Sequence, residues 1–103
     1  MTGAPVLVPD ALAHEYQNLI DLIGATARRQ PVPCLTRDPA ASAMWTGTPA
    51  QQVEASRECL RCPVIDACRG YGRAHPGEFG VYGSLTERER TKAARDTKRE
   101  AGR

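Results

Sequence analysis

The sequence predicts a small all-α domain whose short helices are tied together at one point by four cysteines. The chain has 103 residues, and domains of this size often depend on a metal, a disulfide or a partner for stability. Much of its hydrophobic content is alanine, which buries little area per residue. Apolar residues recur at helical spacing, and no convincing strand pattern occurs outside one glycine-flanked aromatic turn. We therefore expect about four short helices.

The first predicted helix begins at Asp10, a capping residue, and ends near residue 27. Residues 1–9 contain two prolines and are expected to form a flexible arm. Residues 35–48 are expected to form an ordered loop pinned by Trp45. The apolar stripe of the first helix consists of Leu12, Tyr16, Leu19, Ile20 and Ile23.

Three more helices follow from capping signals. The segment 48–51 has threonine, proline and glutamine at the positions of a capping box, so it predicts a helix that runs into Cys59. Pro63 predicts the start of a further short helix, which the His-Pro-Gly segment at 75–77 closes. Residues 86–89 form a second capping box and predict a last helix toward the C-terminus.

The charge is uneven although the net charge is only +2. From residue 88 onward the basic residues outnumber the acidic ones, so the last helix is the basic end of the chain. A mixed-charge helix is most often a solvated face, but lysine and arginine also supply salt-dependent contacts to phosphate. The candidate DNA contacts are Arg88, Arg90, Lys92, Arg95, Lys98 and Arg99.

No secretory signal and no membrane span are expected. The first residues lack a basic stretch followed by an apolar run, and no apolar run approaches the roughly 20 residues that cross a bilayer. The expected location is the cytoplasm. In that reducing compartment, closely spaced cysteines more often bind metal or perform redox chemistry than form structural disulfides.

The cysteines form one close pair and two single positions. Cys34 stands alone beside prolines, Cys59 and Cys62 are separated by two residues, and Cys68 lies in the following helix. Four thiolates suit either tetrahedral Zn²⁺ or an iron–sulfur cluster. Because structural zinc sites usually show two close pairs, the spacing favours a cluster, with zinc and disulfides left open.

Several motifs together resemble the WhiB-like (Wbl) family of actinobacteria and their phages. They are the cysteine spacing, the turn Gly80-Val81-Tyr82-Gly83-Ser84, the pair Asp38-Pro39, and Trp45, within residues 33–99. The resemblance implies one [4Fe–4S] cluster per chain, sensitive to oxygen or nitric oxide, in a cluster-binding domain at residues 10–85 followed by a basic tail at 86–103. The implied ligands are Cys34, Cys59, Cys62 and Cys68.

The same resemblance implies that the protein binds region 4 of the primary sigma factor, within RNA polymerase, and touches promoter DNA. Because acidic residues are interleaved with the basic ones in the tail, weak binding to DNA alone is expected. Tyr82 stands where the family most often has tryptophan, and Ser84 replaces its last glycine. Serine tolerates positive φ poorly, so the turn is expected to differ locally. The candidate sigma contacts are Trp45, Phe79, Gly80, Val81, Tyr82 and Gly83.

No enzymatic activity, small-molecule substrate or membrane partner is expected. One alternative is a zinc-stabilised binding module. Another is a thiol–disulfide reductase that uses Cys59 and Cys62, although such a motif expects a preceding strand and a βαβ context. The two histidines, His14 and His75, are expected at the surface rather than as ligands.

Overall fold

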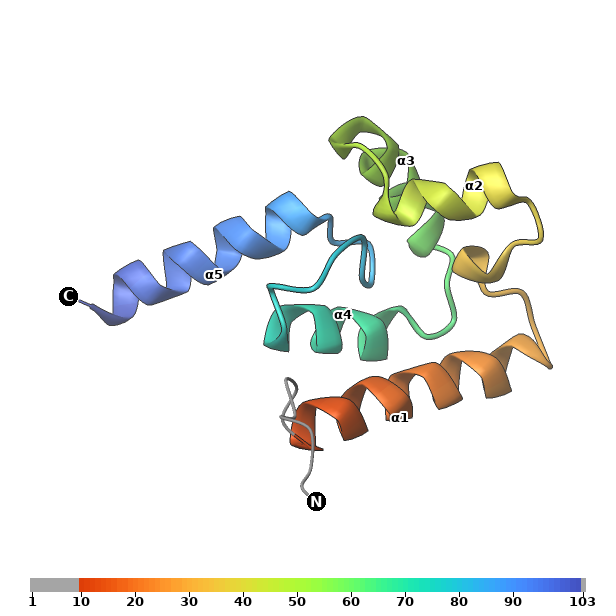
Figure 1. Cartoon of the computed structure of the whole chain (residues 1–103), viewed down its shortest axis with the longest axis horizontal. Coiled ribbons are helices and arrows are strands. Elements are labelled where there is room, and N and C mark those ends of the chain that lie inside the picture. The colour runs from red at the N-terminus through yellow and green to blue at the C-terminus, as the bar shows by residue number, and fades with distance from the viewer. Residues whose placement is uncertain (1–9, 103) are drawn as a thin grey trace, which may run out of the picture.

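The computed structural model describes residues 10–102, and within that range it is helical without a β-strand, which confirms the predicted all-α class (Figure 1). Five α-helices occur there, one more than expected. Two single 3-10 turns, η1 (Pro33–Leu35) and η2 (Met44–Thr46), lie between them. The helices are α1 (Asp10–Ala27), α2 (Pro39–Ala43), α3 (Pro49–Cys59), α4 (Ile65–Ala74) and α5 (Glu87–Ala101).

Helices α1 and α4 pack against each other and form the larger of two hydrophobic cores (Figure 1). The end of α1 at residue 27 is as predicted, whereas the expected flexible arm lies outside the described residues. Tyr16 and Ile20 of the predicted stripe stay more exposed than Leu19 and Ile23. The buried members of this core are Leu19, Ile23, Val32, Val64 and Tyr71.

The expected loop at residues 35–48 contains the additional helix, α2, followed by η2. The Asp38 side chain caps α2 by accepting a hydrogen bond from the Ala40 N–H at 3.0 Å, and Pro39 occupies the first turn. The prediction of a loop was wrong here because a helix of five residues is too short to show a hydrophobic period.

Helix α3 begins with the predicted capping box and carries the smaller core. The Gln51 N–H donates to the Thr48 hydroxyl at 3.2 Å, and the Thr48 N–H donates to the Gln51 side chain at 2.9 Å. Ala55 is fully buried in this core together with Cys59 and Val81, and Met44 and Trp45 pack against them. The smaller core therefore joins α3 to η2 and to the aromatic turn.

Helix α4 begins at residue 65, two residues after the predicted start at Pro63. The intervening residues form tight turns, in which the Cys62 N–H donates to the Cys59 carbonyl at 2.9 Å and the Ile65 N–H donates to the Cys62 carbonyl at 3.3 Å. These turns reverse the chain between α3 and α4 and keep the cysteine pair compact.

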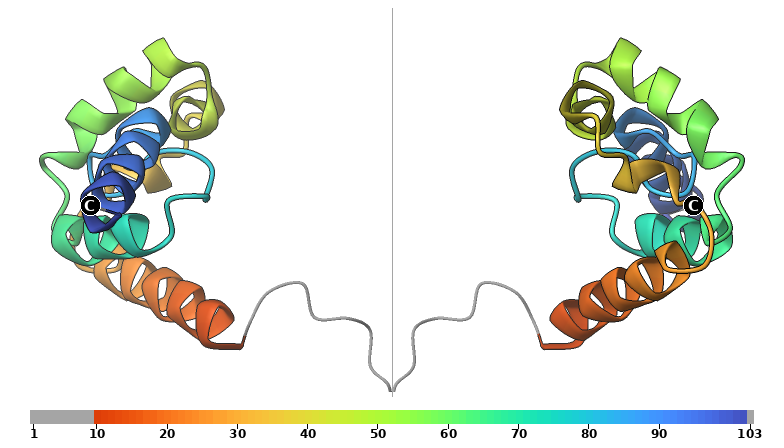
Figure 2. Two further views of the ribbon diagram at one scale, coloured as in Figure 1. Left: turned by 90° about the vertical axis from the view of Figure 1, so that its left-hand side faces the viewer. Right: turned by 90° about the vertical axis from the view of Figure 1, so that its right-hand side faces the viewer.

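Helix α5 starts beside the body of the protein and then extends away from it (Figure 1). Its first turn has the predicted capping box, with the Glu89 N–H donating to the Thr86 hydroxyl at 3.1 Å. The views of Figure 2 show α5 between α3 and α4, in agreement with its packing against both. None of the helices that the structure describes combines the length and apolarity needed to cross a membrane.

Candidate metal centre

The four cysteines lie in separate parts of the chain and line one cavity of about 320 Å³. Cys34 belongs to η1, Cys59 ends α3, Cys62 lies in the turn after it, and Cys68 lies in the first turns of α4. All four are free thiols. The structure therefore brings together the full set of predicted ligands, although they are separated by up to 34 positions (34 to 68) in the sequence.

Apolar side chains surround the sulfur atoms and raise the thiol pKa values. Burial raises the pKa of Cys68 to about 12 and that of Cys34 to about 11, and it also raises the pKa of Cys59. Repulsion between the thiolates is a further cause of each of these raised pKa values. A positively charged centre among them would favour the thiolate form.

Four thiols around one cavity are compatible with a metal centre. Tetrahedral zinc requires its ligands at about 2.0–2.3 Å from one centre, whereas an iron–sulfur cluster spreads four thiolates around a larger body.

Trp45 and the aromatic turn border the cysteines. Trp45, Val81, Tyr82 and Gly83 line the same cavity as the four cysteines. Against the larger effect of burial, N–H groups of Trp45 and Ser84 lower the pKa of Cys59, and that of Gly83 lowers the pKa of Cys68. Such outer contacts orient metal ligands and set their basicity. Sequence reasoning missed this role of the turn, because it depends on contacts between distant segments.

The aromatic turn closes as a two-residue hairpin. Tyr82 and Leu85 exchange backbone hydrogen bonds of 3.0 Å in both directions. Gly83 has φ 55° and Ser84 has φ 71°, and positive φ at both central residues is typical of a type I′ turn. The turn thus forms with serine in the left-handed region. A Cβ on Gly83 would lie 2.3 Å from the Arg69 backbone nitrogen, so the turn presses directly on α4.

Tyr82, a candidate sigma contact, points inward. Its ring lies 5.3 Å from the ring of Tyr71, and the Arg90 guanidinium lies 5.2 Å from its centre. Gly80, Val81 and Gly83 are buried, and Trp45 is half-buried. Among the predicted sigma contacts, only Phe79 is fully accessible, with 79% of its surface exposed.

The predicted basic contacts fall into three groups. Arg88, Lys92, Arg95 and Arg99 lie along one face of α5. Lys98 lies on another face, beside the alanines of the same helix.

Arg90 lies toward the same alanine face as Lys98, but it is only 2% exposed. Its assignment to the DNA-facing set is therefore corrected, since a buried guanidinium presents no charge to phosphate.

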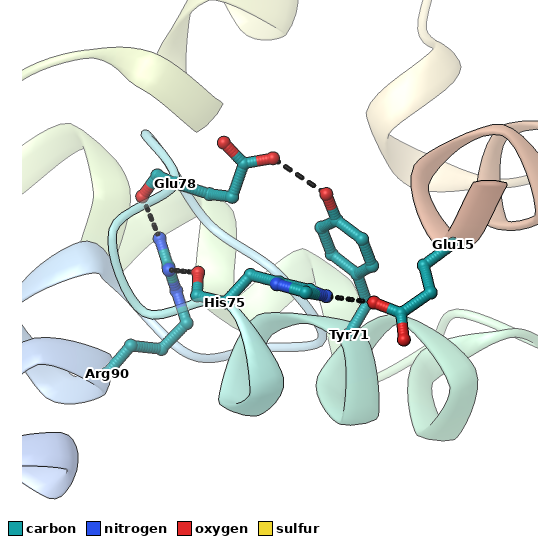
Figure 3. A network of polar contacts seen from close by, with 5 residues as sticks. All are labelled: Glu15, Tyr71, His75, Glu78 and Arg90. Atoms are coloured by element: carbon teal, nitrogen blue, oxygen red, sulfur yellow. Dashed lines mark hydrogen bonds and ion pairs between the residues drawn. The ribbon is translucent and has the colours of Figure 1, made fainter. Parts of the chain in front are cut away.

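Arg90 is the centre of a polar network that sequence reasoning did not detect (Figure 3). Its guanidinium donates to the carbonyls of His75 and Pro76 at 3.3 Å, to that of Glu78 at 2.8 Å, and to that of Gly80. The sequence signal that could have indicated this network is an arginine in the first turn of a capped helix, directly after a glycine-rich segment.

The network continues from this loop to α1 and α4 (Figure 3). The Tyr71 hydroxyl donates to the Glu78 carboxylate at 2.7 Å, and His75 pairs with Glu15 of α1. His75 is thus held in a contact between α4 and α1. Together these contacts attach the segment before the turn to three helices.

Comparisons with known proteins identify transcriptional regulators as relatives of this chain. A family profile described as "Transcription factor WhiB" matches residues 29–93. The transcriptional regulator WhiB2 of Mycolicibacterium smegmatis is 50% identical over 42 residues, which are 41% of this chain and 33% of that protein. The redox- and pH-responsive transcriptional regulator WhiB3 of Mycobacterium tuberculosis is 42% identical over 40 residues, 39% of each chain.

The transcriptional regulator WhiB of Streptomyces coelicolor is 46% identical over 37 residues, 36% of this chain and 42% of that protein. The alignments thus span less than half the length of these curated relatives. No solved structure matches the chain significantly. The profile covers most of the chain, including all four cysteines, the aromatic turn and the start of α5. The chain therefore belongs to the WhiB family of transcription factors.

Proposed function

We propose that this transcription factor holds one [4Fe–4S] cluster on Cys34, Cys59, Cys62 and Cys68, docks on region 4 of the primary sigma factor, and contacts promoter DNA through α5. One observation carries the proposal. Four cysteines from separate segments of the chain line a single cavity.

The four ligands would connect the two halves of the domain. Cys34 follows α1, whereas Cys59, Cys62 and Cys68 span the junction of α3 and α4. An iron–sulfur cluster supplies a redox-active centre, and a family resemblance and a redox-responsive relative support a response to oxygen or nitric oxide. Loss of the connection would release η1 from the cysteine pair and disturb the turn that contacts both Cys59 and Cys68.

The proposed sigma contact centres on Phe79. This side chain is exposed immediately before the turn and lines a surface hollow together with Val53 of α3 and Arg88 of α5. Exposed aromatic residues beside a basic side chain are typical of protein interfaces. Trp45 and Tyr82 would support this surface from within, since both pack against the cores beneath it.

The proposed DNA contact is the basic face of α5. Its four side chains are exposed, but Lys92 pairs with Asp96 at 2.7 Å. So small a number of free positive charges supplies weak, salt-dependent affinity without reading base sequence. Tight binding would then require the sigma factor to hold α5 against the promoter.

The two alternatives gain less support. A zinc module would bring its ligands around one ion, and a reductase would place Cys59 and Cys62 after a strand. In this protein a helix, α3, precedes the pair, and Cys59 is buried in the smaller core. The transcription-factor relatives likewise favour a role other than catalysis.

Anaerobic purification followed by a visible spectrum and assays of iron, sulfide and zinc tests the proposal. We expect a brown protein with about four iron and four sulfide per chain, which bleaches in air or nitric oxide. A colourless protein with one zinc per chain would instead establish the zinc module.

A single substitution then links the cluster to the partner. Cys62→Ser should remove the cluster and binding to sigma region 4 together, and Ser56→Ala on α3 serves as the control that retains both. Normal iron content and normal binding in Cys62→Ser would contradict the proposed function.

A further inference from the structure

The peptide groups of Gly80 are held by two side chains from the first turn of α5. The Gly80 N–H donates to the Glu87 carboxylate at 2.7 Å, and the Gly80 carbonyl accepts from the Arg90 guanidinium. Glu87 and Arg90 are three positions apart and therefore share one helix face. Helix α5 thus holds both the backbone N–H and the carbonyl of Gly80, at the start of the aromatic turn.

Close packing on η2 and α4 also restricts the backbone before and within the turn. A Cβ on Gly80 would lie 2.6 Å from the Trp45 carbonyl oxygen, so this backbone cannot shift toward η2. A Cβ on Gly72 of α4 would lie 2.7 Å from the Tyr82 Cβ and 2.9 Å from the Arg90 Cδ. Tyr82 therefore lies in direct contact with α4 and beneath the Arg90 side chain.

The aromatic turn borders the cysteines directly. Val81, Tyr82 and Gly83 line the same cavity as the four cysteines, and Val81 packs with Cys59 in the smaller core. The backbone N–H groups of Gly83 and Ser84 also lower the pKa of Cys68 and of Cys59, against the larger effect of burial. Hydrogen bonds to ligand sulfur are among the properties that set the reduction potential of an iron–sulfur cluster. They stabilise the additional negative charge of the reduced state and thus raise the potential.

We propose that Glu87 and Arg90 are positioning residues of the metal centre, which fix the aromatic turn in place against the cavity of the four cysteines. The inference rests on the cluster of the proposed function and goes beyond it. The same helix carries the exposed basic face, so the cluster and the DNA-facing helix are coupled through its first turn. Because coupling is reciprocal, fixing α5 on DNA would stabilise the turn over the cluster.

The test compares Arg90→Gln and Glu87→Gln with controls that remove the same charges elsewhere. Arg73→Gln at the end of α4 and Glu100→Gln near the end of α5 are matched controls, since both side chains are exposed. The readouts are the midpoint potential of the cluster, from an anaerobic spectroscopic titration, and the rate at which the cluster is lost in air. Circular dichroism checks that each variant is folded.

We expect Arg90→Gln and Glu87→Gln to have a lower midpoint potential than the unaltered protein and to lose the cluster on the order of tenfold faster. Arg90→Lys keeps the charge but cannot bind several carbonyls at once. Its midpoint potential should therefore lie between that of Arg90→Gln and that of the unaltered protein. The controls should match the unaltered protein. A purely stabilising role would change the rate of loss without shifting the potential.

The outcomes separate this inference from the proposed function. Unaltered protein without iron would overturn both. Unaltered protein that contains the cluster, with Glu87→Gln and Arg90→Gln at the potential of their controls, would overturn this inference alone. If Arg90→Gln fails to fold, Glu87→Gln decides the result, because it removes one carboxylate contact and leaves the buried guanidinium in place.

Discussion

At residue 84 the backbone has φ 71°, in the left-handed region where a side chain is unfavourable. A non-glycine residue there costs roughly 1–2 kcal/mol, and serine has no β-branch to make the cost larger. The type I′ geometry is maintained because Gly83 and Ser84 are held by the hairpin bonds of their neighbours and because Gly83 packs on Arg69 of α4, whose side chain donates to the Gly83 carbonyl at 2.8 Å. Strain at this position is thus the local consequence of a turn that packs on α4 beside the cysteine cavity.

Ser84→Gly should therefore stabilise the folded protein by about 1 kcal/mol, because glycine adopts this conformation without steric cost. The free energy of unfolding, from anaerobic urea titration, measures the effect. Ser84→Ala is the control and should bring no such gain, since alanine retains the Cβ. Equal stability of the glycine and alanine variants would show that the turn is not strained by its side chain.

At Phe79, the effect of a substitution on partner binding can be measured apart from its effect on stability. Because 79% of its surface is exposed, it contributes little to the core. Phe79→Ala should change the free energy of unfolding by less than about 0.5 kcal/mol while markedly weakening binding to sigma region 4. Isothermal calorimetry under anaerobic conditions provides the affinity.

A matched control for this substitution is Leu22→Ala, which truncates an exposed apolar side chain on α1, away from the hollow. Its affinity for the sigma domain should be unchanged. An affinity unaffected by Phe79→Ala would remove the hollow beside the turn from the proposed interface.

Among the elements, α5 has two functions along its length. Its first turn is part of the body, where Thr86 caps it and Arg90 is buried. Gln52 of α3 also reaches this turn, accepting a hydrogen bond from the Glu87 N–H at 3.0 Å. The later turns extend away and carry the basic face. The division of the helix explains why Arg90 belongs to the fold although the arginines around it are exposed.

The double variant Arg95→Gln/Arg99→Gln should weaken promoter binding by the sigma complex about equally for all sequences. The slope of log affinity against log salt should fall by about two, one for each lost phosphate contact. Fluorescence anisotropy at several salt concentrations measures both quantities. Lys98→Gln should have little effect, since Lys98 lies on the alanine face; an equal loss in that variant would refute the single basic face.

On the scale of the whole molecule, two small cores are separated by the cysteine cavity. The larger core joins α1 and α4, and the smaller one joins α3, η2 and the turn. Each contains few large side chains, so neither provides much hydrophobic stabilisation by itself. A cluster bound between them would supply the missing connection and contribute binding free energy to folding.

Removal of iron should therefore lower the thermal stability and increase hydrogen exchange in residues 33–35 and 59–68. Reconstitution with iron and sulfide under anaerobic conditions should restore both. Differential scanning calorimetry and exchange mass spectrometry provide the measurements. Identical melting and exchange of the iron-free and iron-containing protein would show that the cysteines do not stabilise the fold.

Local features of the fold were predictable from short segments of sequence. Both capping boxes form where they were expected, because residues three positions apart complete these hydrogen bonds without help from distant segments. The structure also confirms the predicted end of α3 at Cys59. Helix α2 was missed because only Asp38 and Pro39 signal it.

The sequence by itself determined the helical class, the capped helix starts and the candidate ligand set, since each depends on residue type and short spacing. Only the tertiary structure decided that Tyr82 turns inward, that Arg90 is buried, and that the aromatic turn lines the cysteine cavity. These features arise where α4, α5 and the turn pack together. Packing between segments far apart in the chain selects which side chains are buried, and no local pattern records that choice.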